Sequence, residues 1–304
     1  MKYLLIIFTL LSTIACTPEE DNIRQSEKLQ ELGINDNGLI ECIITQARKN
    51  DISDVTKIQT VNCTDIDISN LNGINNLIHL TSIVLNENKI EQIDISSHAT
   101  LEFIGIYNQY ELSSIDIEAS DSINSINIHN VVLDYFWVNS SNEIDSAISI
   151  DIRDSIIDEI RLSSVYLSSL NFSNSYLESL KVKDATLNTV SLYLYESNIE
   201  LLKFDNVQPI DEIYFGEDSA YGLTTITLSN MDNLKRILLP SKNIEQVFLN
   251  NLPSIESVIL FGNNITNFKF GENVMPSKIS FNNNPLSLET IEYLNGFSEI
   301  EVAY

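Results

Sequence analysis

The chain has 304 residues, of which 43% are hydrophobic, and this content excludes a wholly disordered protein and allows a sizeable core. It carries 43 acidic and 17 basic side chains, a formal net charge of -26, so a nucleic acid would be repelled and is not an expected partner. Such a charge is typical of a solvated acidic surface that keeps a repetitive protein soluble.

The N-terminus predicts a secretion signal. In MKYLLIIFTLLSTIAC, one lysine precedes an apolar run from Tyr3 to Leu11 that is too short to cross a bilayer as a mature helix. The last four of these residues, TIAC, resemble a bacterial lipobox, in which the chain is cut before a lipid-modified cysteine. We therefore predict a signal peptide over residues 1–15, a lipid anchor at Cys16 and a polar, acidic tether over residues 16–27. Ordinary cleavage near Ala15, with Cys16 left as a free thiol, is the alternative.

The same leader predicts an extracytoplasmic protein attached to a membrane through the lipid at Cys16. Thr17 follows the cysteine where an aspartate could stand, which favours a bacterial outer-membrane lipoprotein on either the periplasmic or the cell-surface side. We expect a monomer.

The remaining cysteines, Cys42 and Cys63, form an even pair in an oxidising compartment and predict a disulfide, with two buried reduced thiols as the alternative. The histidines His79, His98 and His129 are scattered without chelating spacing, so neither a metal site nor a cofactor is expected.

Residues 28–57 are predicted to form a helical N-terminal cap. Ile40, Ile43, Ile44 and Ala47 recur at helical spacing and would cover the first turn of the structure that follows. A disulfide between the cysteines would join this helix to the first strand.

From residue 58 the chain repeats apolar residues at positions one, four and six of a unit, and successive units start 20 to 24 residues apart. A repeat of this length predicts a solenoid. These first arms are Ile58/Val61/Cys63, Leu80/Ile83/Leu85, Leu101/Ile104/Ile106, Ile123/Ile126/Ile128, Ala147/Ile150/Ile152, Leu167/Leu170/Phe172, Leu187/Val190/Leu192, Ile210/Ile213/Phe215, Leu234/Ile237/Leu239, Ile255/Val258/Leu260 and Pro276/Ile279/Phe281.

The same spacing of apolar residues recurs between the first arms, for example in Ile90/Ile93/Ile95 and Ile265/Phe268/Phe270, and predicts a second arm in each coil. Inward positions four and six alternate with polar neighbours, as in a strand with one buried face. We predict a mainly β solenoid over residues 58–286, with about eleven coils of two short parallel strands each. A C-terminal cap is predicted over residues 287–304, with Leu288, Ile291 and Leu294 on one helical face.

The pattern L-x-x-L-x-L-x-x-N-x-L, as in LTSIVLNENKI and IESVILFGNNI, resembles the bacterial leucine-rich repeat. The resemblance implies a right-handed coil, and it implies binding of proteins or surface polysaccharides without chemistry. The ladder asparagine of that pattern is present at Asn88, Asn263 and Asn284. Gln109, Val131, Ser155 and Ser175 replace it in the middle coils, which puts the inner-turn hydrogen bonds there in doubt.

No catalytic motif stands out, so we do not expect an enzyme. Large apolar residues occupy outward positions of the first arms, where aromatic groups on a rigid sheet are efficient contact residues for protein or sugar. The predicted partner-binding residues are Phe103, Tyr107, Tyr193, Tyr214, Leu238, Ile259 and Phe261, with Lys235, Arg236 and Lys278 adding positive charge. Stacking of these aromatic groups on one another is the alternative.

The outward row of the second arms contains Arg161, Lys181 and Lys203 in succession, flanked by acidic residues, and is interpreted as a structural charge ladder. The sequence thus favours a binding or adhesion module that uses its first-arm face, with an unidentified protein or surface polysaccharide as partner. Two alternatives are a parallel β-helix enzyme acting on polysaccharides and a structural envelope protein without a soluble ligand.

Overall fold

The computed structural model describes residues 18–96, 98–140, 146–187, 192–195, 197–215, 222–297 and 301–303. The predicted signal peptide and Cys16 lie outside the described residues. Within these ranges, the helices lack the combination of length and apolar character that a membrane crossing requires.

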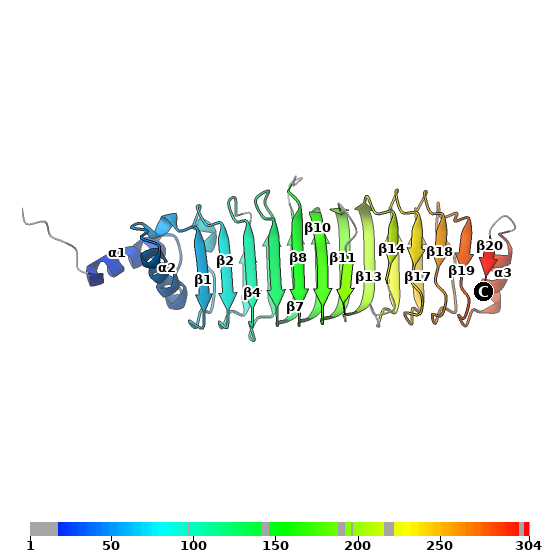
Figure 1. Cartoon of the computed structure of the whole chain (residues 1–304), viewed down its shortest axis with the longest axis horizontal. Helices are drawn as coiled ribbons and strands as arrows, with labels where there is room; N and C mark the ends of the chain where they lie inside the picture. The colour runs from blue at the N-terminus through cyan, green and yellow to red at the C-terminus, as the bar shows by residue number, and fades with distance from the viewer. Residues whose placement is uncertain are drawn as a thin grey trace, which may run out of the picture.

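The solenoid is a rod whose strands lie side by side across its long axis (Figure 1). The first-arm row consists of β1 (Thr60–Thr64), β2 (Ser82–Asn86), β4 (Phe103–Tyr107), β6 (Ser125–His129), β8 (Ile148–Arg153), β10 (Tyr166–Ser173), β12 (Leu192–Tyr195), β14 (Glu212–Tyr214), β16 (Arg236–Leu238), β18 (Ser257–Ile259), β19 (Lys278–Ser280) and β20 (Glu301–Ala303). The second-arm row consists of β3 (Gln92–Ile95), β5 (Ser114–Glu118), β7 (Val132–Asn139), β9 (Ile156–Ser163), β11 (Tyr176–Leu187), β13 (Asn198–Gln208), β15 (Thr225–Ser229) and β17 (Gln246–Asn250).

All pairings between these strands are parallel, and equivalent positions of successive coils meet. Ile104 of β4 pairs with Ile126 of β6, which pairs with Ile150 of β8, and all three side chains are fully buried. Strands β14, β16, β18, β19 and β20 form one sheet, and the others form a fifteen-stranded sheet that bends round the rod. The predicted solenoid of parallel strands is confirmed, with two strands in most coils, but the second arm predicted at Ile265/Phe268/Phe270 forms no strand.

In the arm predicted as Leu187/Val190/Leu192, Leu187 pairs with Leu167 in position one, as predicted, but the later part of the arm is out of register. Leu192 pairs with Leu170 and Tyr193 pairs with Asn171, so Leu192 occupies position four rather than six. A shift of two residues leaves the same face of a strand inward, because side chains alternate with a period of two. The sequence pattern therefore fits both registers, and only the pairing distinguishes them.

Hydrogen bonds inside the turns run through the middle coils as well, where the leucine-rich-repeat resemblance left them in doubt. Asn88 donates to the carbonyls of Cys63 (3.1 Å) and Asn86 (3.0 Å). In the middle coils, the Ser175 hydroxyl accepts from the Ser155 amide at 3.3 Å and donates to the Ser173 carbonyl at 2.9 Å. Serine thus replaces asparagine as the residue that satisfies the buried backbone of the turn.

The N-terminal end is closed by α1 (Pro18–Glu31), α2 (Asn37–Lys49) and the short helices η1 (Val55–Lys57) and η2 (Ile74–Asn76). The predicted apolar stripe on α2, including Ile43 and Ala47, is buried. The boundary predicted between tether and cap does not match a structural boundary, because α1 spans it. Gln25 of α1 is buried and donates to the carbonyl of Ser53 at 2.8 Å.

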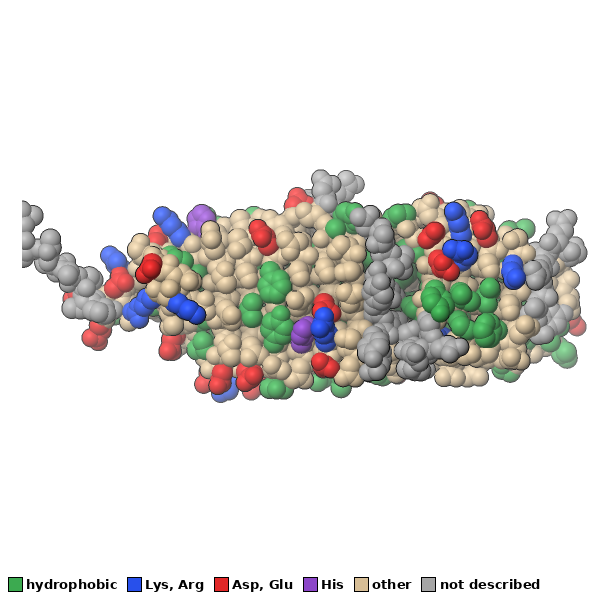
Figure 2. Space-filling model, viewed as in Figure 1, with side chains coloured by type: hydrophobic (Ala, Val, Ile, Leu, Met, Phe, Trp, Pro, Cys, Tyr) green, Lys and Arg blue, Asp and Glu red, His purple; other side chains and the backbone are tan. Residues whose placement is uncertain are grey.

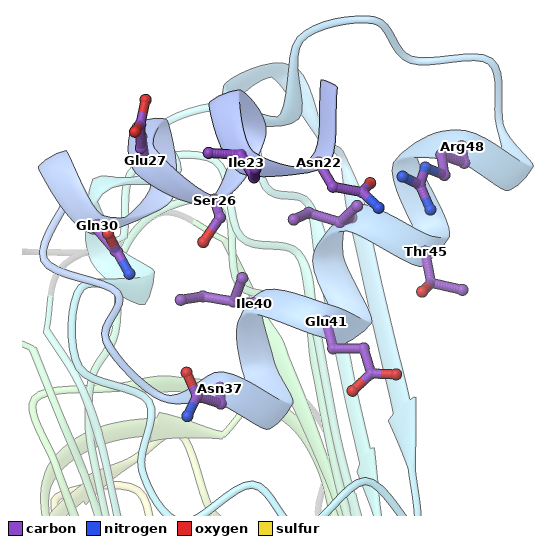
Figure 3. Close-up of a pocket in the computed structure, with 11 residues that line it drawn as sticks. Asn22, Ile23, Ser26, Glu27, Gln30, Asn37, Ile40, Glu41, Thr45 and Arg48 are labelled. Carbon is purple, nitrogen blue, oxygen red and sulfur yellow. The ribbon is translucent and has the colours of Figure 1, made fainter. Parts of the chain in front are cut away.

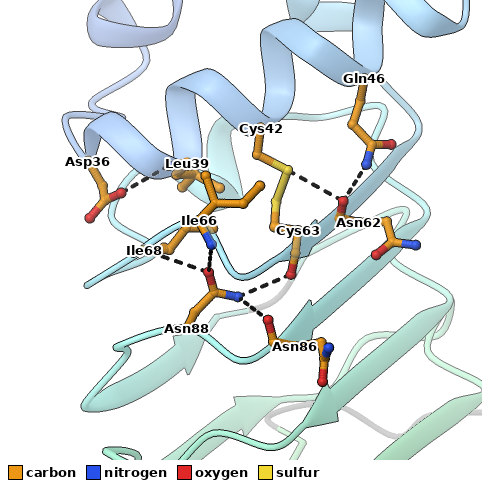
Figure 4. Close-up of a disulfide and its surroundings, with 10 residues drawn as sticks. All are labelled: Asp36, Leu39, Cys42, Gln46, Asn62, Cys63, Ile66, Ile68, Asn86 and Asn88. Atoms are coloured by element: carbon orange, nitrogen blue, oxygen red, sulfur yellow. Dashed lines mark hydrogen bonds between the residues drawn. A yellow bond between two sulfur atoms is a disulfide. The ribbon is translucent and has the colours of Figure 1, made fainter.

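A disulfide joins α2 to β1, as predicted: Cys42 and Cys63 are bonded with an S–S distance of 2.03 Å (Figure 4). Asp36 caps α2 by accepting from the Leu39 amide at 2.9 Å, and its other oxygen accepts from the Ser69 amide at 2.9 Å. Burial alone would raise the pKa of Asp36, but these hydrogen bonds hold it below its usual value. The helix is thus fixed to the first coil at two points, Cys63 and Ser69.

The C-terminal end is closed by α3 (Leu288–Asn295), partly through the predicted face, because Leu294 is buried and Ile291 is half-buried. Leu288 is 78% exposed, whereas Thr290 and Leu294 are buried. The Thr290 hydroxyl accepts from the amide of Phe268 and the Tyr293 hydroxyl from that of Phe270, both at 3.1 Å. Side chains of α3 therefore satisfy the open edge of the last second arm, where a further strand would otherwise pair.

The predicted C-terminal cap over residues 287–304 also contains β20, which was not predicted. This strand pairs with β19 and extends the first-arm row beyond the last predicted coil.

Candidate functional site

The outward side chains of the first-arm strands form one face of the rod. Hydrophobic side chains gather in two separate groups on this face (Figure 2). The group on β4 contains Phe103 and Tyr107 and is here named the aromatic plate. The other group, named the C-terminal patch, comprises Tyr214, Leu238, Ile259 and Phe261 on and beside β14, β16 and β18.

The aromatic plate depends on the glycine between its two rings. A Cβ atom at Gly105 would lie 2.7 Å from Cε2 of Tyr107 and 3.0 Å from Cε1 of Phe103. Both rings therefore lean across the glycine and cover the middle of β4. Sequence reasoning overlooked Gly105, although an isolated glycine within a strand is a recognised sign of such a close approach.

Polar residues adjoin the aromatic plate on the next two strands. The ring of His129 on β6 meets Tyr107 edge to face, with 5.0 Å between the ring centroids. Asp151 on β8 accepts from Nε of Arg153 at 3.1 Å and lies 2.7 Å from its Nη2. Burial lowers the pKa of His129, while the Asp151 carboxylate acts in the opposite direction. Sequence reasoning did not select these three residues, and their approach depends on the strand register.

The C-terminal patch is a continuous row. Tyr214 pairs with Leu238, and Leu238 pairs with Ile259, so their side chains stand on adjacent strands. Tyr214 is 56% exposed and Phe261 is 39% exposed, while Leu238 and Ile259 are half-buried. A contiguous apolar row that is not fully buried is a surface feature that often marks a contact with another molecule.

The positive charge predicted beside this patch is partly balanced within the sheet. Arg236 lies 3.0 Å from the carboxylate of Glu212 on the neighbouring strand. Lys235, which directly precedes β16, is exposed, and so is Lys278, the first residue of β19. The surroundings of the patch are therefore of mixed charge.

The structure does not bring all the predicted contact residues together. The aromatic plate and the C-terminal patch are separated by five coil steps, about 24 Å at the usual spacing between neighbouring strands. Tyr193 stands on β12 between them, and its side chain lies outside the described residues. One small ligand could touch either group but not both.

The second-arm face carries the predicted charge ladder, and two of its three cations, Arg161 and Lys181, pair with one glutamate. Arg161 lies over the ring of Trp137, 4.6 Å from its centroid, and also pairs with Glu159. Lys181 pairs with the same glutamate. Burial disfavours the charge on Glu159, but the hydrogen bonds from Lys181 and Arg161 hold its pKa below the usual value. The charges of Arg161, Lys181 and Glu159 are thus paired within the chain, which is consistent with a structural role.

A groove also separates α1 from α2 at the N-terminal cap, where Ile23 and Ile40 face the space between the helices (Figure 3). Ile23 is 56% exposed. The groove belongs to the cap and contains none of the predicted contact residues. Among the residues that the structure describes, there is no group of three or more His, Cys, Asp or Glu side chains that could hold a metal ion.

No protein-family model matches the sequence, and the comparison with curated proteins gave no match. Among solved structures, the chain is similar to an internalin from Listeria monocytogenes, with a TM-score of 0.26 and 13% identity over 88% of this chain and 94% of that one. It is also similar to a leucine-rich-repeat protein from Leptospira interrogans, with a TM-score of 0.27 and 13% identity over 82% of this chain and 85% of that one. Similarity at these levels does not extend to a function.

Proposed function

We propose that this protein is a lipid-anchored, extracytoplasmic leucine-rich-repeat protein that binds a partner protein and carries out no chemistry itself. The C-terminal patch is the contact surface. The observation that supports this role is the exposed row from Tyr214 through Leu238 to Ile259, with Phe261 beside it. Such a row on paired strands is already rigid, so little side-chain entropy is lost when a partner covers it.

The contrast with the opposite face supports the same assignment. On the second-arm face the large side chain of Trp137 is engaged by Arg161 and Tyr135 within the chain. Tyr214 and Phe261, in comparison, leave much of their surface in water. Aromatic residues in this state are the residue type that contributes most at protein interfaces.

A pull-down from intact, cross-linked cells tests the contact surface. The double variant Tyr214→Ser, Phe261→Ser should lose the captured partner, because burial of these rings provides the free energy of association. Phe248→Ser is the matched control, since Phe248 is also exposed, at 53%, but stands on β17 of the other face. The proposal fails if the double variant captures the same proteins as the parent chain.

The location rests on the leader sequence and is supported by the disulfide. Disulfides persist in oxidising compartments, and Cys42 and Cys63 are bonded here. Metabolic labelling with palmitate should mark the parent chain, and Cys16→Ser should abolish the label and release the protein from the membrane fraction. Labelling that survives Cys16→Ser would show that the anchor lies elsewhere, and a parent chain that takes up no label would show that the anchor is absent.

A further inference from the structure

A polar area with no net charge lies between the aromatic plate and β12 on the first-arm face. We name it the polar tract and define it by Asn127 and His129 on β6, Asp151 and Arg153 on β8, and Asn171 on β10. Its two opposite charges are bonded to each other, Arg153 to Asp151. The other residues of these strands that are not buried are Ser125, Ser149, Tyr166, Ser168, Ser169 and Ser173. The chain as a whole has a net charge of -26, so this neutral area differs from the acidic composition of the rest of the protein.

Two polar atoms in the tract are shielded from solvent and have no hydrogen-bond partner among the described residues. They are Nε2 of His129 and the side-chain oxygen of Asn171. Nε2 of His129 lies 3.8 Å from the nearest oxygen of Asp151, which is beyond hydrogen-bond distance. Leaving such an atom unpaired is costly, and native proteins keep few of them. An incoming group that supplies a hydrogen bond to each would remove that cost.

The two unpaired atoms stand close to the same carboxylate. Asn171 is the strand partner of Asp151, and Asp151 is the strand partner of Asn127. His129 on β6 is likewise the strand partner of Arg153 on β8. Hydrogen-bonding groups are thus presented on three adjacent strands, about 4.8 Å apart from one strand to the next.

The aromatic plate borders this tract directly. Gly105 pairs with Asn127, and Tyr107 pairs with His129. The rings of Phe103 and Tyr107 lean over Gly105 and present an apolar surface beside the polar groups. An apolar surface next to a few placed polar groups is the usual composition of a small-molecule site.

We propose that the aromatic plate and the polar tract together bind a neutral glycan. A pyranose ring has an apolar C–H face that stacks on an aromatic ring, and its hydroxyl groups can each donate and accept a hydrogen bond. The sugar hydroxyls can therefore donate to the Asn171 oxygen, and they can pair with Nε2 of His129 in either tautomer of the neutral ring. A neutral sugar brings no charge that would disturb the Asp151–Arg153 pair.

The composition of this surface fits a neutral glycan better than a protein partner or an acidic polysaccharide. A protein partner needs a larger apolar area, which the C-terminal patch offers and the polar tract does not. An acidic polysaccharide would meet a strongly negative chain whose Arg153 is already paired. This proposal concerns a surface separate from the C-terminal patch, so its failure leaves the proposed protein contact untouched.

Isothermal titration of the full-length Cys16→Ser chain with cellohexaose, mannohexaose, chitohexaose and, as the acidic probe, hexagalacturonate tests the proposal. At least one neutral hexasaccharide should bind with a dissociation constant of about 1 mM or tighter, and the acidic one should not. Tyr107→Ala and Asn171→Ala should each weaken that binding about tenfold, because one loses the stacking ring and the other a hydrogen-bond acceptor. Tyr214→Ala, on the C-terminal patch, should leave it unchanged.

The two variants lie on different strands, so a thermal melt that shows misfolding of one leaves the other as the test. Tyr107→Phe keeps the ring and should retain most of the binding. Three outcomes overturn the proposal: none of the neutral hexasaccharides binds, the acidic one binds as tightly, or both variants bind like the parent chain while folded.

Discussion

The two faces of the rod are built from the same repeat but use their outward residues differently. On the second-arm face, Trp137, Arg161, Glu159 and Lys181 contact one another across β7, β9 and β11. On the first-arm face, Tyr214 is 56% exposed and Phe261 is 39% exposed. Both faces cover the same core, so the difference in their contacts arises from the outward side chains. The cluster around Trp137 therefore stabilises the coils that it joins, whereas we propose that the C-terminal patch serves a partner.

The largest effect on stability is expected from Trp137→Ala. This change removes a half-buried ring that contacts Tyr135 and Arg161. We expect a loss of about 2 kcal/mol in the free energy of unfolding, below the value for a fully buried aromatic residue. Urea unfolding followed by circular dichroism measures it. If the midpoint does not move, the second-arm network is not a stabilising element and the comparison between the faces fails.

A smaller loss, about 1 kcal/mol at neutral pH, is expected for Glu159→Gln, since the two cations it pairs with are partly exposed and screened. The pKa of Glu159 is lower in the folded chain than its usual value. Its contribution is therefore present above the unfolded pKa and disappears as the pH falls through the folded one. Parent and variant should converge in strongly acidic solution. A gap that stays constant with pH would assign the loss to packing instead.

Asp116→Asn is expected to act in the opposite direction, with a gain of about 0.5 kcal/mol at neutral pH. Burial, together with the neighbouring Asp94 and Glu118, raises the pKa of Asp116. A raised pKa means that the folded chain binds this proton more readily, so the ionised carboxylate destabilises the fold and the cost disappears in acid. Thermal melts at several pH values measure the difference. A variant less stable than the parent at neutral pH would disprove it.

The smallest effect on stability is expected from Tyr214→Ser. Its side chain is 56% exposed, so we expect a change within about 0.5 kcal/mol. The same urea titration as for Trp137→Ala provides the comparison. A loss as large as that of the tryptophan variant would mean that Tyr214 stabilises the coils rather than waiting for a partner.

The sequence alone was sufficient to predict the solenoid, because isoleucine, leucine and phenylalanine at positions four and six mark a strand with one buried face. The disulfide between Cys42 and Cys63 followed from the number of cysteines and was confirmed. The strand β20 was missed because Glu301, Val302 and Ala303 contain too little of that pattern. Thr290 was also missed, since a hydroxyl that completes a strand edge has no apolar signature.

The candidate site could be predicted only in part. Alternation along a strand places Phe103, Tyr107 and Phe261 on the outward side without any coordinates. Whether they meet depends on the spacing of coils, which separates the aromatic plate from the C-terminal patch. The pairing of Arg236 with Glu212 bridges 24 residues and requires the register of two strands. The unpaired atoms of His129 and Asn171 are visible only in atomic positions.

Site-specific photo-cross-linking in intact cells tests the central claim most directly. A photoreactive phenylalanine analogue is placed at Tyr214 on the first-arm face or at Phe248 on the second-arm face, which are 56% and 53% exposed. The account predicts a discrete cross-linked protein adduct from position 214 and none from position 248. Equal adducts from both positions, or an adduct from position 248 alone, would contradict it.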